Sequence, residues 1–294
     1  MVEKIRTNQS ILEKFESADG HLVSNGDSIT TVYHVKSKHV LIQAVGYLKH
    51  VLATEMECNV YFRGQSKIYS KLSPTLYRSQ DTQKQKSSRD VALKKYIKES
   101  DGLILRGVAD YAKEPLLQHY GIKTKWLDIV DNIWIALWFA CNDCISKGNL
   151  DRYLCFQRRQ VDAGNLVRSY AYIYLIKAGS TPVLGKVGYF EGCDTRFIDL
   201  RVAAPSIFLR PHAQHGLLFT RATHNDHKNT DYSEFVVGIL RIELSDALAW
   251  LGEGGLLDTH ALFPPPIYDF GYMQLLDAAP VGNKLVGGIH VVCA

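Results

Sequence analysis

Two kinds of hydrophobic spacing occur along this chain, and they predict strands and helices in an irregular order. Dense apolar runs rich in β-branched and aromatic residues, typical of buried strands, cover residues 30–35, 60–62, 170–176 and 235–242. Apolar positions at helical spacing predict a surface helix over residues 40–52, and a short helix starts at Ser245. Because strands and helices do not alternate regularly, we predict an α+β fold: a mixed or antiparallel sheet core with peripheral helices.

One stretch, residues 118–140, combines polar chemistry with a strongly apolar run. His119, Tyr120, Thr124 and Asp128 precede a segment in which apolar residues cover most of a helix surface. We therefore expect a largely buried helix over residues 131–146. A polar cluster at the mouth of such a helix commonly lines a cleft.

The remaining segments carry weaker signals. We expect Gly64 to end the strand over 60–62, and Pro115 to lie in the first turn of a helix that ends at Gly121. The other expectations are a short helix at 10–15, a turn at 25–27, a polar loop at 80–88, a helix from 88 to 111, an irregular segment at 179–200, a strand–turn–strand element at 206–221, a polar loop at 224–231 and a last helix at 267–276.

Size and composition suit one large folded unit. The chain has 294 residues, 46% hydrophobic and 22% charged, and no apolar run long enough to span a membrane. We predict a peripheral segment over residues 1–36 and a single α+β domain over 37–294. The first residues show no secretory signal, so we expect a cytoplasmic protein that makes no membrane contact.

The six cysteines are expected to be free thiols in a cytoplasmic chain. Cys141 and Cys144 form a CxxC sequence inside the predicted buried helix, without a second pair, so core packing is favoured over zinc or redox chemistry. The histidines are scattered and we expect no metal site, although His224 and His227 in a loop leave metal binding there as an alternative.

Charge is unevenly distributed. The net charge is +4, yet residues 63–98 hold ten Lys/Arg against two Asp. Such a segment suits an anionic ligand, either a dinucleotide or a nucleic acid. The alternative is a solvated helix face and loop, and the segment has few interleaved aromatic residues for binding nucleic acid.

Three groups of residues carry candidate chemistry, and each joins a charged or amide side chain to a glycine. They are Arg63-Gly64-Gln65, His119-Tyr120-Gly121 with Thr124 and Asp128, and Arg210-Pro211 with Gln214-His215-Gly216. None matches a phosphate-binding loop, a dinucleotide fingerprint or a nucleophile elbow. Arg63, at a strand end, would present its guanidinium to a phosphate or carboxylate.

In order, these segments resemble the motifs of the FRG-domain family. The resemblance is carried by Tyr61-Phe62-Arg63-Gly64-Gln65, by residues 72–78, by Gln118-His119-Tyr120-Gly121 with Thr124 and Leu127-Asp128, by Ala136-Leu137 with Phe139-Ala140, by Arg210 with Gln214, Gly216 and Phe219, and by Leu262-Phe263-Pro264. They cover roughly residues 45–276. The chain departs from the pattern at Trp126 and at prolines 264–266. The resemblance implies a bacterial protein with a role in anti-phage defence.

The order of elements is also similar to that of ADP-ribosyltransferases, which implies that fold and NAD as substrate. By this resemblance, Arg63 holds the pyrophosphate with Gly64 and Gln65 beside it. Thr124, His119 and Tyr120 would line the nicotinamide side. A nearby carboxylate would stabilise an oxocarbenium-like transition state. The acceptor of ADP-ribose would be a protein or a nucleic acid.

The motif at residues 210–219 has Gln214 at the position where the resemblance to ADP-ribosyltransferases implies a glutamate. A glutamine can hydrogen-bond a ribose hydroxyl but cannot act as a base or an anion. Glu234, Glu243 or Asp128 would have to supply the charge. The catalytic candidates are therefore Arg63, His119, Tyr120, Thr124, Asp128 and Gln214.

Each candidate also has a structural interpretation. Arg63 would form a buried pair with Asp128, and His119 and Tyr120 would be core residues. Thr124 and Asp128 would cap helices, Gln214 would satisfy a strand edge, and Trp126 is a core residue or a base-stacking one. Three functions remain: an NAD-dependent transferase or hydrolase, a non-catalytic domain of the same shape that senses a nucleotide or phage protein, and nucleic-acid binding through residues 63–98.

Overall fold

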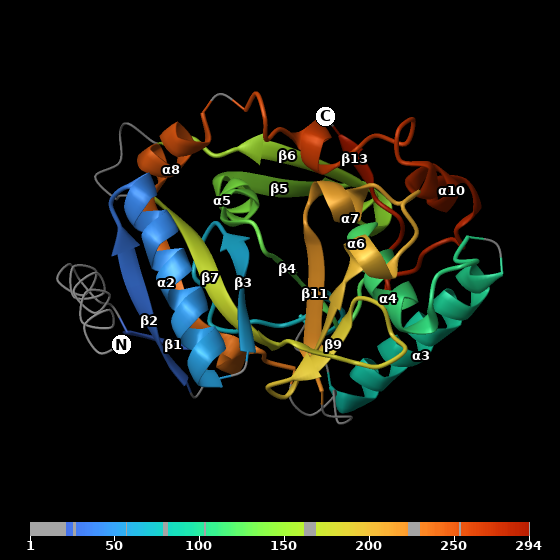
Figure 1. Cartoon of the computed structure of the whole chain (residues 1–294). Helices are drawn as coiled ribbons and strands as arrows, with labels where there is room; N and C mark the ends of the chain where they lie inside the picture. Colours follow the sequence, from blue (N-terminus) through green and yellow to red (C-terminus); the bar gives the residue numbers. More distant parts are fainter. Residues whose placement is uncertain are drawn as a thin grey trace.

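The main sheet takes its strands from most of the length of the chain. The computed structural model describes residues 22–25, 28–56, 58–78, 82–102, 104–161, 169–222, 230–252 and 254–293 (Figure 1). Within these residues ten strands form one sheet in the order β1-β2-β12-β7-β3-β4-β11-β10-β9-β8. Their bounds are β1 Leu22–Asn25, β2 Ser28–Val35, β3 Cys58–Gln65, β4 Leu127–Val130, β7 Tyr170–Gly179, β8 Thr181–Pro182, β9 Tyr189–Gly192, β10 Thr195–Asp199, β11 Gly216–Arg221 and β12 Val236–Glu243.

The sheet is mixed. β12 pairs with β2 in parallel and with β7 antiparallel, and β3 pairs antiparallel with both β7 and β4. The protein is therefore α+β with a large mixed sheet, and the expected strands at 30–35, 170–176 and 235–242 are confirmed in β2, β7 and β12. β1 and β2, from the segment expected to be peripheral, form one edge of this sheet.

Helices cover the sheet and enclose its cores. α2 Lys38–Met56 confirms the helix expected at 40–52, and it packs with α5 Ile133–Cys141 and α8 Leu244–Leu251 around one hydrophobic cluster. A second cluster lies under α3 Gln83–Asp101, α4 Asp110–His119 and α10 Phe270–Ala278. In Figure 1, α2 lies beside β2 and β3, while α3 and α4 lie at the other side. The short helices are η1 Thr75–Tyr77, η2 Asn149–Asp151, α6 Leu200–Ala203, α7 Arg210–Ala213, η3 Ser233–Phe235 and α9 Thr259–Leu262.

The buried helix is shorter than its hydrophobic pattern indicated. α5 ends at Cys141, and the residues expected to continue it form β5 Asn142–Lys147. β5 pairs antiparallel with β6 Tyr153–Arg158, and β13 Val291–Cys293 completes a second sheet in the order β13-β6-β5. Pairing with β6 overrides the local helical pattern. Of the CxxC pair, Cys141 is therefore buried at the end of α5, whereas Cys144 is exposed in β5.

Several expected loops are regular elements. The loop expected at 80–88 contains the start of α3, because Thr82 and Gln85 form a reciprocal capping box. That helix stops at Asp101 instead of reaching Tyr111, and α4 begins separately at Asp110, with Pro115 inside it rather than in its first turn.

The segments expected to be irregular or β-shaped in the second half also differ. Residues 179–200 contain β8, β9 and β10, whose hairpin pairings give the glycine-rich segment a regular backbone. Residues 206–221 are not strand–turn–strand: α7 precedes β11, and His215 takes a positive φ of 50° between them. The last helix begins at Phe270, where Asp269 caps it. The helix expected at 10–15, residues 26–27 of the expected turn and residues 224–229 of the loop expected at 224–231 fall outside the described residues.

Gly64 does not end β3, which continues to Gln65. It faces α5 so closely that an added Cβ would overlap the carbonyl oxygen of Ala136 and lie 2.8 Å from the backbone nitrogen of Ala140. The absence of a side chain thus sets the distance between α5 and the sheet.

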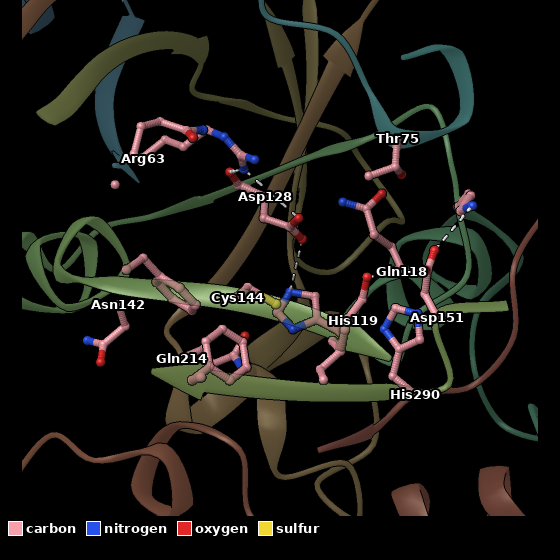
Figure 2. A pocket seen from close by; sticks show the side chains of 18 of the residues that line it. Arg63, Thr75, Gln118, His119, Asp128, Asn142, Cys144, Asp151, Gln214 and His290 are labelled. Atoms are coloured by element: carbon pink, nitrogen blue, oxygen red, sulfur yellow. Dashed lines mark hydrogen bonds and ion pairs between the residues drawn. The ribbon is translucent and has the colours of Figure 1, made fainter. Parts of the chain in front are cut away.

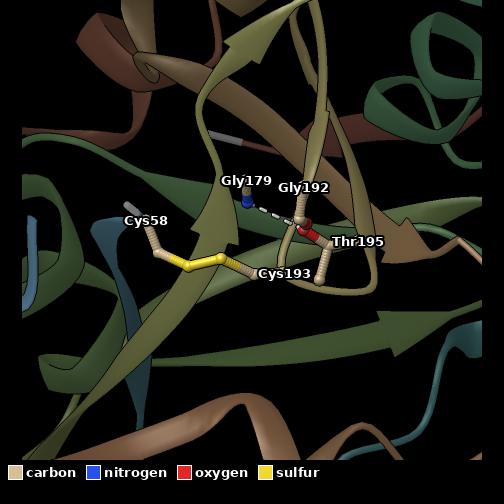
Figure 3. Close-up of a disulfide and its surroundings, with 5 residues drawn as sticks. All are labelled: Cys58, Gly179, Gly192, Cys193 and Thr195. Carbon is tan, nitrogen blue, oxygen red and sulfur yellow. Dashed lines mark hydrogen bonds between the residues drawn. A yellow bond between two sulfur atoms is a disulfide. The ribbon is translucent and has the colours of Figure 1, made fainter. Parts of the chain in front are cut away.

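A disulfide joins Cys58 at the start of β3 to Cys193 in the β9–β10 turn (Figure 3). The expectation that all six cysteines are free is therefore wrong for these two. Their separation of 135 residues hides the pairing in the sequence. Cys58 pairs in register with Gly179, whose backbone N–H donates to Thr195 Oγ1 at 2.8 Å, so strand pairing brings the two cysteines together.

We predict that Gly64→Ala destabilises the fold by at least about 3 kcal/mol, because the new methyl group would force α5 off the sheet. Gly46→Ala is the matched control, since Gly46 lies in α2 with open space at its Cβ position. It should gain about 0.5–1 kcal/mol. Urea unfolding measures both; a Gly64→Ala protein as stable as wild type would contradict this packing.

We further predict that reductant lowers the free energy of unfolding by about 3–5 kcal/mol, because breaking the Cys58–Cys193 bond releases a loop of 135 residues in the unfolded chain. Alkylation of the unfolded, unreduced protein followed by mass spectrometry should label four cysteines: Cys141, Cys144, Cys155 and Cys293. Labelling of all six would show that the bond is absent.

Candidate active site

A cleft of about 920 Å³ opens beside the central strands of the main sheet. Segments distant in sequence meet there: β3, the end of α4, β4, β5, the α7–β11 segment and the residues before β13. Its charged and imidazole-bearing lining residues are Arg63, Lys67, Arg78, Arg89, His119, Lys123, Asp128, Asp143, Asp151, Arg210, Lys284 and His290. Seven Lys/Arg against three Asp make this cleft basic.

Asp128 lies between Arg63 and His119 (Figure 2). Arg63 Nη1 donates to the Asp128 backbone oxygen at 2.6 Å and lies 4.0 Å from its carboxylate. His119 Nε2 is 3.9 Å from the other carboxylate oxygen. The Asp128 side chain is 48% exposed, whereas that of Arg63 is partly buried and that of His119 is buried. The pairing with Asp128 that formed the structural interpretation of Arg63 is therefore present, and it leaves the carboxylate open to the cleft.

His119, the last residue of α4, fits against a glycine. A Cβ on Gly216 would lie 2.8 Å from His119 Nε2, so only glycine at the start of β11 leaves room for the ring. Burial lowers the pKa of His119 to about 4, with Asp128 opposing and the Arg210 cation assisting the shift. The ring is therefore neutral at pH 7, and it does not cancel the charge of Asp128.

Arg210 begins α7 and is buried. Its Nη1 donates to the backbone oxygen of His119 at 2.7 Å. The guanidinium lies 4.5 Å from the ring centres of both Tyr120 and Tyr272. Arg210 thus connects α7 to the end of α4 and lines the cleft between them.

Two predicted site residues do not line the cleft. Tyr120 is fully buried and donates its hydroxyl to Asp269 at 2.8 Å; burial raises its phenol pKa well above the usual value. Thr124 is also fully buried, donates to Gln118 Oε1 and accepts the backbone N–H of Trp126. Both residues hold the wall behind the cleft.

The remaining candidates divide in the same way. Gly64, Gln65 and Gln214 line the cleft, with the Gln214 amide donating to the Leu262 backbone oxygen at 2.9 Å. Glu234 pairs with Arg221, and Glu243 ends β12, so neither glutamate lines the cleft. Trp126 is a core residue, not a lining one.

Some lining residues escaped the sequence reasoning. Gln118 and Arg210 lie within the family motifs and line the cleft, although neither is among the predicted catalytic or cofactor-binding residues. Asp143 fell inside the expected helix, and Asp151 is joined to Lys123 across 3.7 Å. His290 had no signal of its own; its ring occupies the space that a Cβ on Gly121 would need. Gly121 is thus the one residue of the motif that indicates a close neighbour at this point.

No group of three or more His, Cys, Asp or Glu side chains suited to a metal ion occurs among the residues that the structure describes. The His224–His227 pair lies outside them. Among these residues, too, no helix is both long and apolar enough to cross a membrane.

The fold and cleft thus define an α+β protein with a basic cleft of about 920 Å³. A family model described as the FRG domain matches residues 58–148, from β3 through β5, so the chain contains an FRG domain, as the motifs indicated. The match includes Arg63, His119 and Asp128 and ends before Arg210. No curated protein and no solved structure matches the chain.

We predict that acid destabilises the fold partly through His119. The unfolded imidazole takes up a proton near pH 6.5, but the folded one only near pH 4, so its contribution is complete above pH 6.5 and is lost as the pH falls towards 4. His119→Gln should remove on the order of 3 kcal/mol of the stability loss between pH 7 and 4. Exposed His212→Gln is the control and should follow wild type in urea unfolding. If His119→Gln also follows it, the burial argument fails.

Proposed function

We propose that the cleft binds NAD and that the protein cleaves the nicotinamide glycosidic bond, by ADP-ribosyl transfer or by hydrolysis, on an ADP-ribosyltransferase-like core. The observation that carries the proposal is Asp128: a half-exposed carboxylate in a basic cleft. The cleft volume lies at the upper end of the range for small-molecule sites, as a dinucleotide requires.

Asp128 supplies the charge that cleavage needs. The sugar gains positive charge as nicotinamide leaves, and a fixed anion beside it lowers the barrier. Arg63 holds the Asp128 backbone, and its Nη1 stays 4.0 Å from the carboxylate, so the anion is oriented without a tight ion pair. Because the pKa of His119 is low, its ring adds no competing positive charge.

The basic lining supplies the second requirement, attraction of the diphosphate. Cations around a cleft raise the local concentration of an anionic ligand and favour its binding. Four of the seven lining Lys/Arg belong to the basic segment 63–98: Arg63, Lys67, Arg78 and Arg89. The family resemblance adds a role in anti-phage defence, with a protein or nucleic acid as acceptor.

A second candidate is a domain that senses a nucleotide without cleaving it. Two observations around residues 210–234 favour it. The Gln214 amide is held by the Leu262 backbone, and the nearest glutamate along the chain, Glu234, is paired with Arg221. In that case NAD binds and remains intact.

We predict that purified protein consumes NAD and that Asp128→Asn lowers kcat/KM by roughly 10²–10³-fold, the usual effect of losing one electrostatic contact to the transition state. Asp277→Asn, an equal charge change at an exposed position outside the cleft, should leave kcat/KM unchanged. The readouts are NAD loss and automodification.

Two other outcomes separate the candidates. If wild type leaves NAD intact while NAD raises its melting temperature, the sensing function is supported and the enzyme proposal fails. If Asp128→Asn cleaves NAD as fast as wild type, Asp128 does not have the assigned role.

A further inference from the structure

Arg210 carries a buried charge with unused hydrogen-bonding groups. Its side chain belongs to a residue only 1% exposed, and Nε and Nη2 have no partner in the described part of the chain. The rings of Tyr120, Tyr272 and Phe263 surround the guanidinium at 4.5, 4.5 and 5.3 Å. Aromatic faces stabilise a cation but do not accept its in-plane N–H groups in the way an anion does.

The nearest buried carboxylate is already engaged. Asp269 accepts the backbone N–H of Arg210 at 3.1 Å, the Tyr120 hydroxyl and the backbone N–H of Tyr272. None of these bonds goes to the guanidinium. Arg221 offers the comparison: it is also buried beside aromatic rings, yet Glu234 pairs with it. A buried charge without a counterion is unfavourable, so an anion that enters the cleft and binds the Arg210 guanidinium would be stabilised there.

Two neutral imidazoles adjoin Arg210. His290 Nε2 and both ring nitrogens of His119 are buried without hydrogen-bond partners among the described residues. Burial, followed by the Arg210 cation, lowers the pKa of His290 to about 4. Tyr272 joins His290 to Arg210, since its hydroxyl donates to the His290 backbone oxygen at 2.6 Å while its ring contacts the guanidinium. Arg210, His119 and His290 all line the cleft.

We infer that Arg210, with His290 and His119, forms the subsite for the phosphate groups of the nucleotide. Arg210 Nε and Nη2 would donate to phosphate oxygens in a forked arrangement, and an imidazole N–H would donate to another. This inference rests on the proposed function, because it assumes that a nucleotide enters the cleft. It transfers the role of holding phosphate from Arg63 to Arg210, and leaves Arg63 to position Asp128.

The test is calorimetric titration with inorganic pyrophosphate and with ADP-ribose, neither of which requires a glycosidic cleavage step. We expect Arg210→Met to weaken both by roughly ten- to a hundredfold, as loss of charged hydrogen bonds does. Arg210→Lys should also weaken them, because one ammonium cannot replace the fork. Arg221→Met is the matched control: it removes another buried arginine, one outside the cleft, and should bind both probes like wild type.

Stability and NMR supply independent readouts. Arg210→Met should lower the melting temperature less than Arg221→Met does. The first loses a bond to a backbone oxygen, whereas the second leaves the Glu234 carboxylate unpaired. Pyrophosphate should raise the imidazole pKa values of His119 and His290 in wild type, a measurement that needs no variant.

The inference is overturned if wild type does not bind pyrophosphate, or if Arg210→Met and Arg210→Lys bind it as tightly as wild type. Should pyrophosphate binding depend on Arg210 while NAD stays uncleaved, the subsite stands and only the proposed cleavage fails.

Discussion

The bond between the Arg210 guanidinium and the His119 backbone oxygen is the contact on which this site depends. It fixes the end of α4 to α7, and Gly216 then lets the His119 ring lie against the start of β11. The same histidine faces the carboxylate of Asp128, whose backbone oxygen accepts a hydrogen bond from Arg63 in β3. The two hydrogen bonds join residues 65 and 91 positions apart, so segments distant in sequence meet around one histidine.

This arrangement gives the two arginines different tasks. Arg63 donates to Asp128, so its charge is partly used within the protein. Arg210 donates only to a backbone oxygen and keeps two N–H-bearing nitrogens unused within the described residues. One arginine holds a carboxylate open to the cleft, and the other holds a charge that no acid of the described protein neutralises by hydrogen bonding. Together they suit a ligand with a developing cation at one end and phosphate at the other.

The sequence predicted the fold class, the strands β2, β7 and β12 and the helices α2 and α8, because their hydrophobic spacing is strong and agrees with their tertiary environment. It failed where long-range pairing decides the local structure. Residues 142–147 continue a helical pattern but pair with β6, and the partner of Cys58 lies 135 residues away.

The candidate site was likewise predicted only in part. The motifs placed Arg63, His119, Asp128 and Gln214 on one cleft, but burial decides which neighbours face it. Tyr120 and Thr124 carry suitable chemistry and yet point into the wall, which spacing alone does not reveal. Gly64, Gly121 and Gly216 make room for Ala136, His290 and His119, a close approach that the sequence does not assign to particular partners.

A crystal structure of the protein with ADP-ribose would test the central claim most directly. We predict that a phosphate oxygen lies within hydrogen-bonding distance of Arg210 Nε or Nη2, and that the terminal ribose lies beside the Asp128 carboxylate. Phosphates held by Arg63 with Arg210 left without an anion, or a nucleotide bound outside this cleft, would contradict the account.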